Sequence, residues 1–214
     1  MAVFKNGPNG SFSGKVGSVV GYKWKGIDVI RGLPRKSHKP RSEARLANEQ
    51  AMKLIMGVLK PLKLLIRMGF RDAAAPLNMS AFNLALSRNK KHAIKGQYPH
   101  LEIDWDSLRI SEGDRAAVRN LTAEWVADGL RLTWATSIGS APGHAADLLS
   151  FAVYSPAEDF WRPFFNEATR GAGECVLSHD ENWLSSGAHV FAMFVSFTGD
   201  AVSDSSHIHV PARG

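Results

Sequence analysis

The 214-residue sequence predicts an α+β protein in which an N-terminal β-hairpin and helices are followed by an antiparallel β-sandwich. Three observations predict this class. Seven glycines and alternating apolar residues occupy the first 33 positions, as in a hairpin. Apolar residues then recur at helical spacing between positions 51 and 66. From about residue 100, short apolar segments alternate with turns, which is typical of a two-sheet sandwich. We expect two domains, a basic one over residues 1–98 and an acidic sandwich over 99–214.

The hairpin is predicted by residues that alternate in character between positions 15 and 25. One parity carries Val16, Val20, Tyr22 and Trp24, and the other carries Lys15, Lys23 and Lys25. This period of two predicts one half-buried strand over 15–25, a turn at Lys25-Gly26 and a second strand over 27–31. Two prolines then bracket a basic connector at 35–39, which we expect to be a loop or an extended arm.

Two helical segments are predicted between the hairpin and the sandwich. Ser42 is a candidate N-cap for a helix that Pro61 should kink or divide. A shorter helix is expected from about Asn78, with Phe82 and Leu86 on one face. It should end in the polar cluster at 87–91.

The C-terminal half is predicted to consist of short strands. We expect them near residues 101–105, 108–110, 119–126, 130–136, 148–154, 173–178, 189–197 and 206–210. Asp128-Gly129 favours a tight hairpin turn between two of them. The segment 189–195 is apolar at both parities, so it should be a central strand buried on both faces. The stretch Gly129–Trp134 and this long strand together resemble a fibronectin type III or immunoglobulin-like module, and such folds host many functions.

The N-terminal segment carries a more specific pattern. It reads Gly14-Lys15-Val16-Gly17, Val20-Gly21-Tyr22-Lys23, Lys25-Gly26, Val29-Ile30-Arg31 and Pro34. It resembles the opening of an uncharacterised domain family common in Bacteroidota, a domain of unknown function with two helices and a β-rich C-terminal half. Arg45 stands where that pattern has glutamine. The resemblance implies an architecture and no mechanism.

Charge is divided unevenly along the chain. Residues 1–71 hold 15 Lys and Arg against 3 acidic residues, a net charge of +12, whereas residues 72–214 hold 11 against 17, a net charge of −6. Such a basic block attracts polyanions and speeds encounter with them. The candidate contact residues are Lys15, Lys23, Lys25, Arg31, Arg35, Lys36, Lys39, Arg41 and Arg45. Tyr22 and Trp24 lie among them and would either stack on bases or pack against the helix that follows.

Motifs for catalysis are weak. Gly14-Lys15 continues into a strand rather than a phosphate-binding helix, and no serine lies in a G-x-S-x-G elbow. His207 and His209 share a strand face that His189 could join as a metal site, although solvated histidines explain them better. Asp104 and Asp106 are as consistent with a polar strand edge as with acid–base chemistry. We therefore expect no enzyme, no cofactor, no metal and a structural role for Cys175.

Two functions fit these observations. The first is a structural protein that self-associates, its basic region meeting the acidic sandwich of another copy. The alternative is a DNA- or RNA-binding protein that uses residues 15–45 as a basic arm, an activity compatible with a virion-like particle. With no apolar run of membrane length, no signal-peptide pattern and one cysteine, we expect a location in the cytoplasm or in a particle assembled there.

Overall fold

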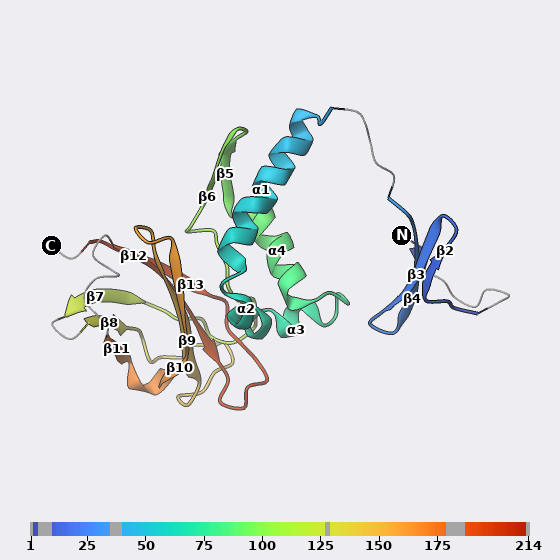
Figure 1. Cartoon of the computed structure of the whole chain (residues 1–214). Helices are drawn as coiled ribbons and strands as arrows, with labels where there is room; N and C mark the ends of the chain where they lie inside the picture. The colour runs from blue at the N-terminus through green and yellow to red at the C-terminus, as the bar shows by residue number, and fades with distance from the viewer. Residues whose placement is uncertain (1, 4–9, 35–39, 127–128, 179–186, 213–214) are drawn as a thin grey trace. The chain divides into compact units, whose positions relative to one another are not determined.

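Four antiparallel sheets and four α-helices make up the described part of the chain (Figure 1). The computed structural model describes residues 2–3, 10–34, 40–126, 129–178 and 187–212. These residues form two compact units, Met1–Ser42 and Glu43–Gly214. The observed mixture of helices and antiparallel sheets confirms the α+β class.

The N-terminal unit is a four-stranded sheet in the order β1-β4-β3-β2. Its strands are β1 (Ala2–Val3), β2 (Gly14–Val16), β3 (Val19–Trp24) and β4 (Ile27–Gly32). The turn at Lys25-Gly26 is confirmed, with both residues at positive φ (46° and 81°), as a two-residue hairpin requires. The single strand expected over 15–25 is wrong: the chain reverses at Gly17-Ser18, so that Val16 pairs with Val19.

The helices follow the predicted spacing. The first, α1 (Glu43–Leu59), begins directly after Ser42, and Pro61 separates it from α2 (Lys63–Gly69), because proline has no N–H to continue the helix. A short helix α3 (Arg71–Ala74), which we did not predict, precedes α4 (Ala81–His92). At the start of α4, the Ser80 hydroxyl accepts a hydrogen bond of 3.2 Å from the Asn83 amide.

A small hairpin leads from the helices to the sandwich. It consists of β5 (Ile94–Gln97) and β6 (His100–Ile103). The strand expected at 108–110 is absent from the described structure. Instead, the buried Asn89 side chain of α4 hydrogen-bonds both backbone groups of Arg109 at 2.8 Å, replacing the partner strand that a ladder would supply.

Seven strands form the sandwich in two sheets. The three-stranded sheet has the order β11-β8-β7, with β7 (Thr122–Val126), β8 (Gly129–Thr133) and β11 (Glu174–Ser178). The four-stranded sheet has the order β10-β9-β12-β13, with β9 (Leu148–Ser155), β10 (Phe160–Thr169), β12 (Ala188–Val195) and β13 (Ser206–Val210). Seven antiparallel strands in two such sheets are the arrangement of immunoglobulin-like sandwiches. β7 and β8 pair as the expected hairpin, whose Asp128 lies outside the described residues.

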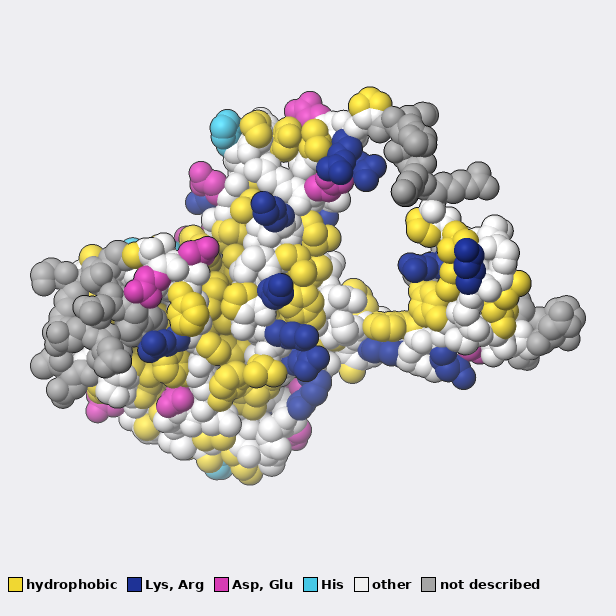
Figure 2. Space-filling view, in the orientation of Figure 1, with side chains coloured by type: hydrophobic (Ala, Val, Ile, Leu, Met, Phe, Trp, Pro, Cys, Tyr) yellow, Lys and Arg dark blue, Asp and Glu magenta, His cyan; other side chains and the backbone are white. Residues whose placement is uncertain are grey.

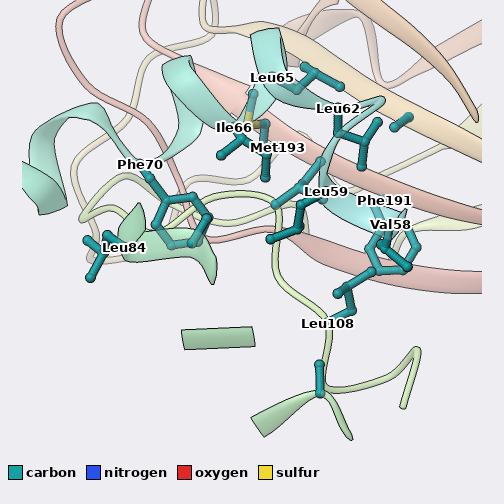
Figure 3. Close-up of a cluster of buried hydrophobic side chains, with 14 of the residues drawn as sticks. Val58, Leu59, Leu62, Leu65, Ile66, Phe70, Leu84, Leu108, Phe191 and Met193 are labelled. Carbon is teal, nitrogen blue, oxygen red and sulfur yellow. The ribbon is translucent and has the colours of Figure 1, made fainter. Parts of the chain in front are cut away.

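The two central strands are buried on both faces, as predicted for 189–195. Phe151 and Ala192 pair across β9 and β12 and face the three-stranded sheet. Ala152 and Phe191 pair next to them and face the helices. Figure 3 shows this second core, in which Leu59, Leu62 and Ile66 of the helical segment pack with Phe191 and Met193 of β12.

The unit boundary follows from that second core. Because α1, α2 and α4 bury their apolar faces against the sandwich, they belong to one unit with it. The compact units therefore divide between residues 42 and 43, whereas the sequence suggested a division between 98 and 99.

Candidate functional site

The basic residues expected to form one contact surface are distributed over both units. Lys15, Lys23, Lys25 and Arg31 lie in the N-terminal sheet or its turn, and all four are exposed. Arg41 follows that sheet and is also exposed. Arg45 belongs to α1 in the other unit and pairs with Glu49 at 2.9 Å. The remaining three candidates, Arg35, Lys36 and Lys39, lie outside the described residues.

One face of the N-terminal sheet combines cations with aromatic rings, and we call it the aromatic face. In a β-sheet, cross-strand partners lie on the same face, and so do residues two positions apart on one strand. The pairing register therefore shows which residues lie on the aromatic face. They are Val3, Lys15, Val20, Tyr22, Trp24, Ile27, Val29 and Arg31. The Arg31 guanidinium lies 5.8 Å from the centre of the Tyr22 ring, within cation–π range.

This arrangement corrects the expected separation of lysines from aromatic residues. We predicted Lys15 on the face opposite Tyr22, because a single strand over 15–25 gives them opposite parity. Because the chain reverses at Gly17-Ser18, odd and even positions no longer correspond to opposite faces on the two sides of this turn. Lys15 therefore pairs with Val20 and lies on the aromatic face. Lys23 does lie on the opposite face, where its ammonium is 4.0 Å from the Asp28 carboxylate.

The N-terminal unit buries few apolar side chains. Among its described residues, only Val29 is a buried hydrophobic residue, at 5% exposure. On the opposite face, Phe12 covers Gly21 so closely that a Cβ there would lie 2.4 Å from the Phe12 carbonyl oxygen. Val16 and Trp24 remain 58% and 45% exposed. Figure 2 shows yellow apolar and dark blue basic side chains together on the surface of this unit.

The larger unit contains an acidic hollow of about 520 Å³, defined by Asp72, Glu112, Asp114 and Asp200. Three of these carboxylates have arginine partners: Asp72 pairs with Arg71 at 2.9 Å, Glu112 with Arg88 at 3.1 Å and Asp200 with Arg115 at 4.0 Å. Hydrogen bonds from Ser196 and Thr198 lower the pKa of Asp200. Asp114 is exposed and has no ion pair among the described residues.

The histidines considered as metal ligands come together on the helix-facing side of the four-stranded sheet. His189 and His209 are cross-strand partners, and His189 Nδ1 lies 2.9 Å from His207 Nε2. His207 Nδ1 in turn lies 3.0 Å from the Asp106 carboxylate. No group of three or more His, Cys, Asp or Glu residues in the described ranges could hold a metal ion. The histidines are instead stacked with aromatic rings, including Trp105, whose centre is 4.8 Å from that of His189.

The other candidate acids and the cysteine have structural surroundings. Asp104 accepts a hydrogen bond of 2.7 Å from the Ser107 hydroxyl. Cys175 is half-buried on β11, and burial raises the pKa of its thiol to about 11. A high pKa leaves little thiolate at neutral pH, which disfavours a nucleophilic role.

Sequence reasoning missed a pocket lined by the rings of Trp105, Tyr154 and Trp161, since these residues come from a connecting segment and two strands. It also missed the buried ion pair of Arg170 and Asp147, both of which are fully buried. Neither feature has a motif, because each depends on strand register between distant segments. Polar spacing alone did indicate Asp106 as a residue of interest, and its contact with His207 spans 101 positions.

No helix in the described ranges is long and apolar enough to cross a membrane.

Comparisons with known proteins identify a family for the chain but no activity. No curated protein and no solved structure matches the chain. A family model described as "Family of unknown function (DUF6266)" matches residues 11–209, from the N-terminal sheet to the last strand of the sandwich. The chain therefore belongs to this family of unknown function, as its N-terminal pattern indicated.

Proposed function

We propose that the chain is a non-enzymatic structural protein that self-associates through its basic N-terminal unit. The observation that carries the proposal is the small core of that unit, with Val29 as the one buried hydrophobic residue among those described. Domains of about 40 residues bury too little surface to be stable alone and usually need a disulfide, a metal or a partner. The only cysteine of the chain is Cys175, in the other unit, so a disulfide within the N-terminal unit is excluded.

The exposed surface of the N-terminal sheet supports a protein partner. Val16 on β2 and Trp24 on β3 are exposed apolar side chains, and their burial in a contact would be favourable by about 25 cal/mol per Å² of apolar surface. β2 is an edge strand of the described sheet, and all three of its residues are exposed. An edge strand can add to a sheet of another chain through backbone hydrogen bonds.

Charge favours a second copy as that partner. Residues 1–42 hold nine Lys and Arg against one acidic residue, Asp28, a net charge of +8. The acidic hollow at Asp72, Glu112, Asp114 and Asp200 is present in every copy. Three of its carboxylates are paired with arginines, so Asp114 is the one we expect to attract the basic unit of another chain. Contacts between two different surfaces of identical chains are heterologous, and they generate rings or filaments.

Sedimentation velocity of the full chain, at rising concentration, tests the proposal. We expect larger species at high protein concentration. Their amount should fall as salt is raised from about 0.1 M to 1 M, because the Debye length then falls from about 10 Å to about 3 Å. The variant Lys15→Glu/Arg31→Glu should sediment as the smallest species. Its matched control is Lys91→Glu/Lys95→Glu, which changes charge equally at two exposed lysines of the larger unit and should assemble normally.

A monomer at every concentration and salt would refute the proposal. Equal loss of assembly in both variants would also contradict it, because net charge rather than the aromatic face would then be responsible. Circular dichroism should show the same secondary structure for all three chains, since the four substituted side chains are exposed.

Nucleic-acid binding is the second candidate, and the aromatic face favours it specifically. Lys15 and Arg31 share this face with Tyr22 and Trp24, a combination that can contact phosphates and stack on bases. Filter binding to single-stranded DNA and RNA should then show affinity falling linearly with salt on logarithmic axes, with a slope of about −0.7 per phosphate contacted. Lys15→Glu/Arg31→Glu should flatten that slope and Lys91→Glu/Lys95→Glu should not. Absence of binding at low salt would eliminate this candidate.

A further inference from the structure

An aromatic pocket of about 450 Å³ lies in the larger unit, between α1 and the hairpin of β9 and β10. We call it the aromatic pocket and define it by Trp105, Tyr154, Trp161, Gln50, Lys53 and Asp159. Its volume is within the range of about 300–1,000 Å³ that is usual for small-molecule sites. All of its lining residues belong to the larger unit, and none of them lines the acidic hollow.

Three rings form its apolar wall. Trp105 stacks on Tyr154 with ring centres 4.8 Å apart, and Tyr154 contacts Trp161 at 4.9 Å. Trp105 also stacks on His189 at 4.8 Å, and the Tyr154 and His189 rings are 6.4 Å apart. Tyr154 and His189 are cross-strand partners on one face of the sheet, and Trp105 stacks across both of them. Tyr154 and His189 therefore share one face of Trp105, and neither covers the other face.

The polar groups of the aromatic pocket include both donors and acceptors. Gln50 donates from Nε2 to the Pro99 carbonyl at 2.7 Å, while its Oε1 is buried and has no hydrogen-bond partner among the described residues. Because Oε1 is closed to solvent, Gln50 faces a ligand as a donor, through the second N–H of its Nε2. Lys53 supplies an ammonium donor, and the Asp159 carboxylate accepts from the Tyr154 hydroxyl at 2.8 Å.

From this combination we propose that the aromatic pocket binds a saccharide. The C–H groups on the face of a sugar ring carry partial positive charge and are attracted to the negative face of an aromatic ring. Sugar hydroxyls both donate and accept hydrogen bonds, so they can donate to Asp159 and accept from Lys53 and from Gln50 Nε2. One ligand class thus satisfies the apolar wall and all three polar groups.

An alkylammonium ligand is the main competitor, because aromatic rings beside a carboxylate also bind cations. Lys53 disfavours it, since a second cation in the same pocket would repel the first. A wholly apolar ligand is disfavoured by Lys53 and Asp159, because it would displace water from both charges without replacing the lost hydrogen bonds.

Saturation-transfer NMR on the full chain tests the proposal, with cellohexaose, xylohexaose, mannohexaose and N-acetylchitohexaose as separate probes. We expect transfer to at least one oligosaccharide, and quenching or enhancement of tryptophan fluorescence over the same titration. Gln50→Leu and Lys53→Met should each weaken binding about three- to tenfold, the effect of losing one hydrogen bond. Lys60→Met is the matched control, because this exposed lysine follows α1 and does not line the pocket.

Three results would overturn the proposal. The first is no transfer to any of the four oligosaccharides. The second is binding that Gln50→Leu, Lys53→Met and Lys60→Met leave equally strong, which would assign the ligand to another surface. The third is binding of tetramethylammonium that is tighter than that of all four saccharides. Thermal melts of the three variants show whether each is folded, and Lys53→Met is informative even if Gln50→Leu is not, because Lys53 is exposed.

Discussion

Replacing Arg170 by methionine should destabilise the larger unit severely. Its guanidinium is fully buried, with Nε 3.5 Å from the Asp147 carboxylate and Nη2 donating to the Ala116 carbonyl at 2.6 Å. It also lies 3.7 Å from the centre of the Phe194 ring. Methionine keeps much of the volume and removes the charge, so Asp147 would stay buried without this partner.

The contacts that Asp147 would keep place the expected loss of unfolding free energy at the lower end of the range for a broken buried ion pair. Removing one partner of a buried ion pair costs about 3–5 kcal/mol. Asp147 would retain two contacts, a hydrogen bond of 2.9 Å from the His144 amide and Arg115 Nη1 at 3.4 Å. We therefore expect Arg170→Met to lower the free energy of unfolding by about 3 kcal/mol. With a urea m-value of roughly 2–3 kcal/mol/M, the midpoint should fall by about 1–1.5 M.

Urea unfolding followed by tryptophan fluorescence measures this change, since Trp134 donates to the Arg170 carbonyl at 2.9 Å and reports on its surroundings. Arg131→Met is the matched control: this arginine is 41% exposed, and its pair with Glu124 should contribute less than about 1 kcal/mol. The reasoning would be refuted if Arg170→Met and Arg131→Met lowered the midpoint equally. It would also fail if Arg170→Met raised it, which would mean that desolvation of the arginine outweighs its contacts.

Two further predictions concern titration. Burial, followed by the charges of the two neighbouring histidines, lowers the pKa of His189 to about 4. The unfolded chain holds histidine near 6.5, so the stability from neutral His189 should be complete above about pH 6.5 and lost towards pH 4, at up to ~1.4 kcal/mol per pH unit. Between pH 6.5 and pH 4, the urea midpoint of His189→Gln should depend less on pH than that of the unaltered chain. Equal pH dependence in the two chains would contradict the lowered pKa of His189. Burial raises the pKa of Cys175 to about 11. Iodoacetamide at pH 8 should therefore modify Cys175 roughly a hundredfold more slowly in the folded chain than in the urea-unfolded chain, because it reacts with the thiolate. Mass spectrometry measures both rates, and similar rates would contradict a buried thiol.

Local patterns predicted most elements of the fold. The helix division at Pro61 and the turn at Lys25-Gly26 depend on residues with strong conformational preferences, and both are confirmed. The central strand at 188–195 was recognisable because burial on both faces leaves an uninterrupted apolar run. β10 was missed because most of its side chains are exposed and a register shift between Phe164 and Ala168 interrupts its alternation.

The candidate sites were less predictable because they depend on register. A parity count through 15–25 assigned Lys15 to the wrong face, since it could not detect the reversal at Gly17-Ser18. The aromatic pocket needs Trp105 to be placed over Tyr154, a contact between a connecting segment and a strand about 50 positions later. The sequence shows which aromatic residues are available, but no spacing between them predicts such a contact.

The unit boundary changes what charge can explain about assembly. Counted to residue 71, the basic part carries +12 and the rest −6, which suggests attraction between two oppositely charged halves. Counted by the compact units, residues 1–42 carry +8, while residues 43–214 hold 17 Lys and Arg against 19 acidic residues, a net charge of −2. The larger unit is thus almost neutral, so its overall field cannot select the orientation of a basic partner. In the proposed assembly, orientation must therefore come from a local surface, for which the acidic hollow is the concrete candidate. Asp114→Lys should then weaken assembly as much as Lys15→Glu/Arg31→Glu does, whereas the same reversal at Glu102, outside the hollow, should have little effect.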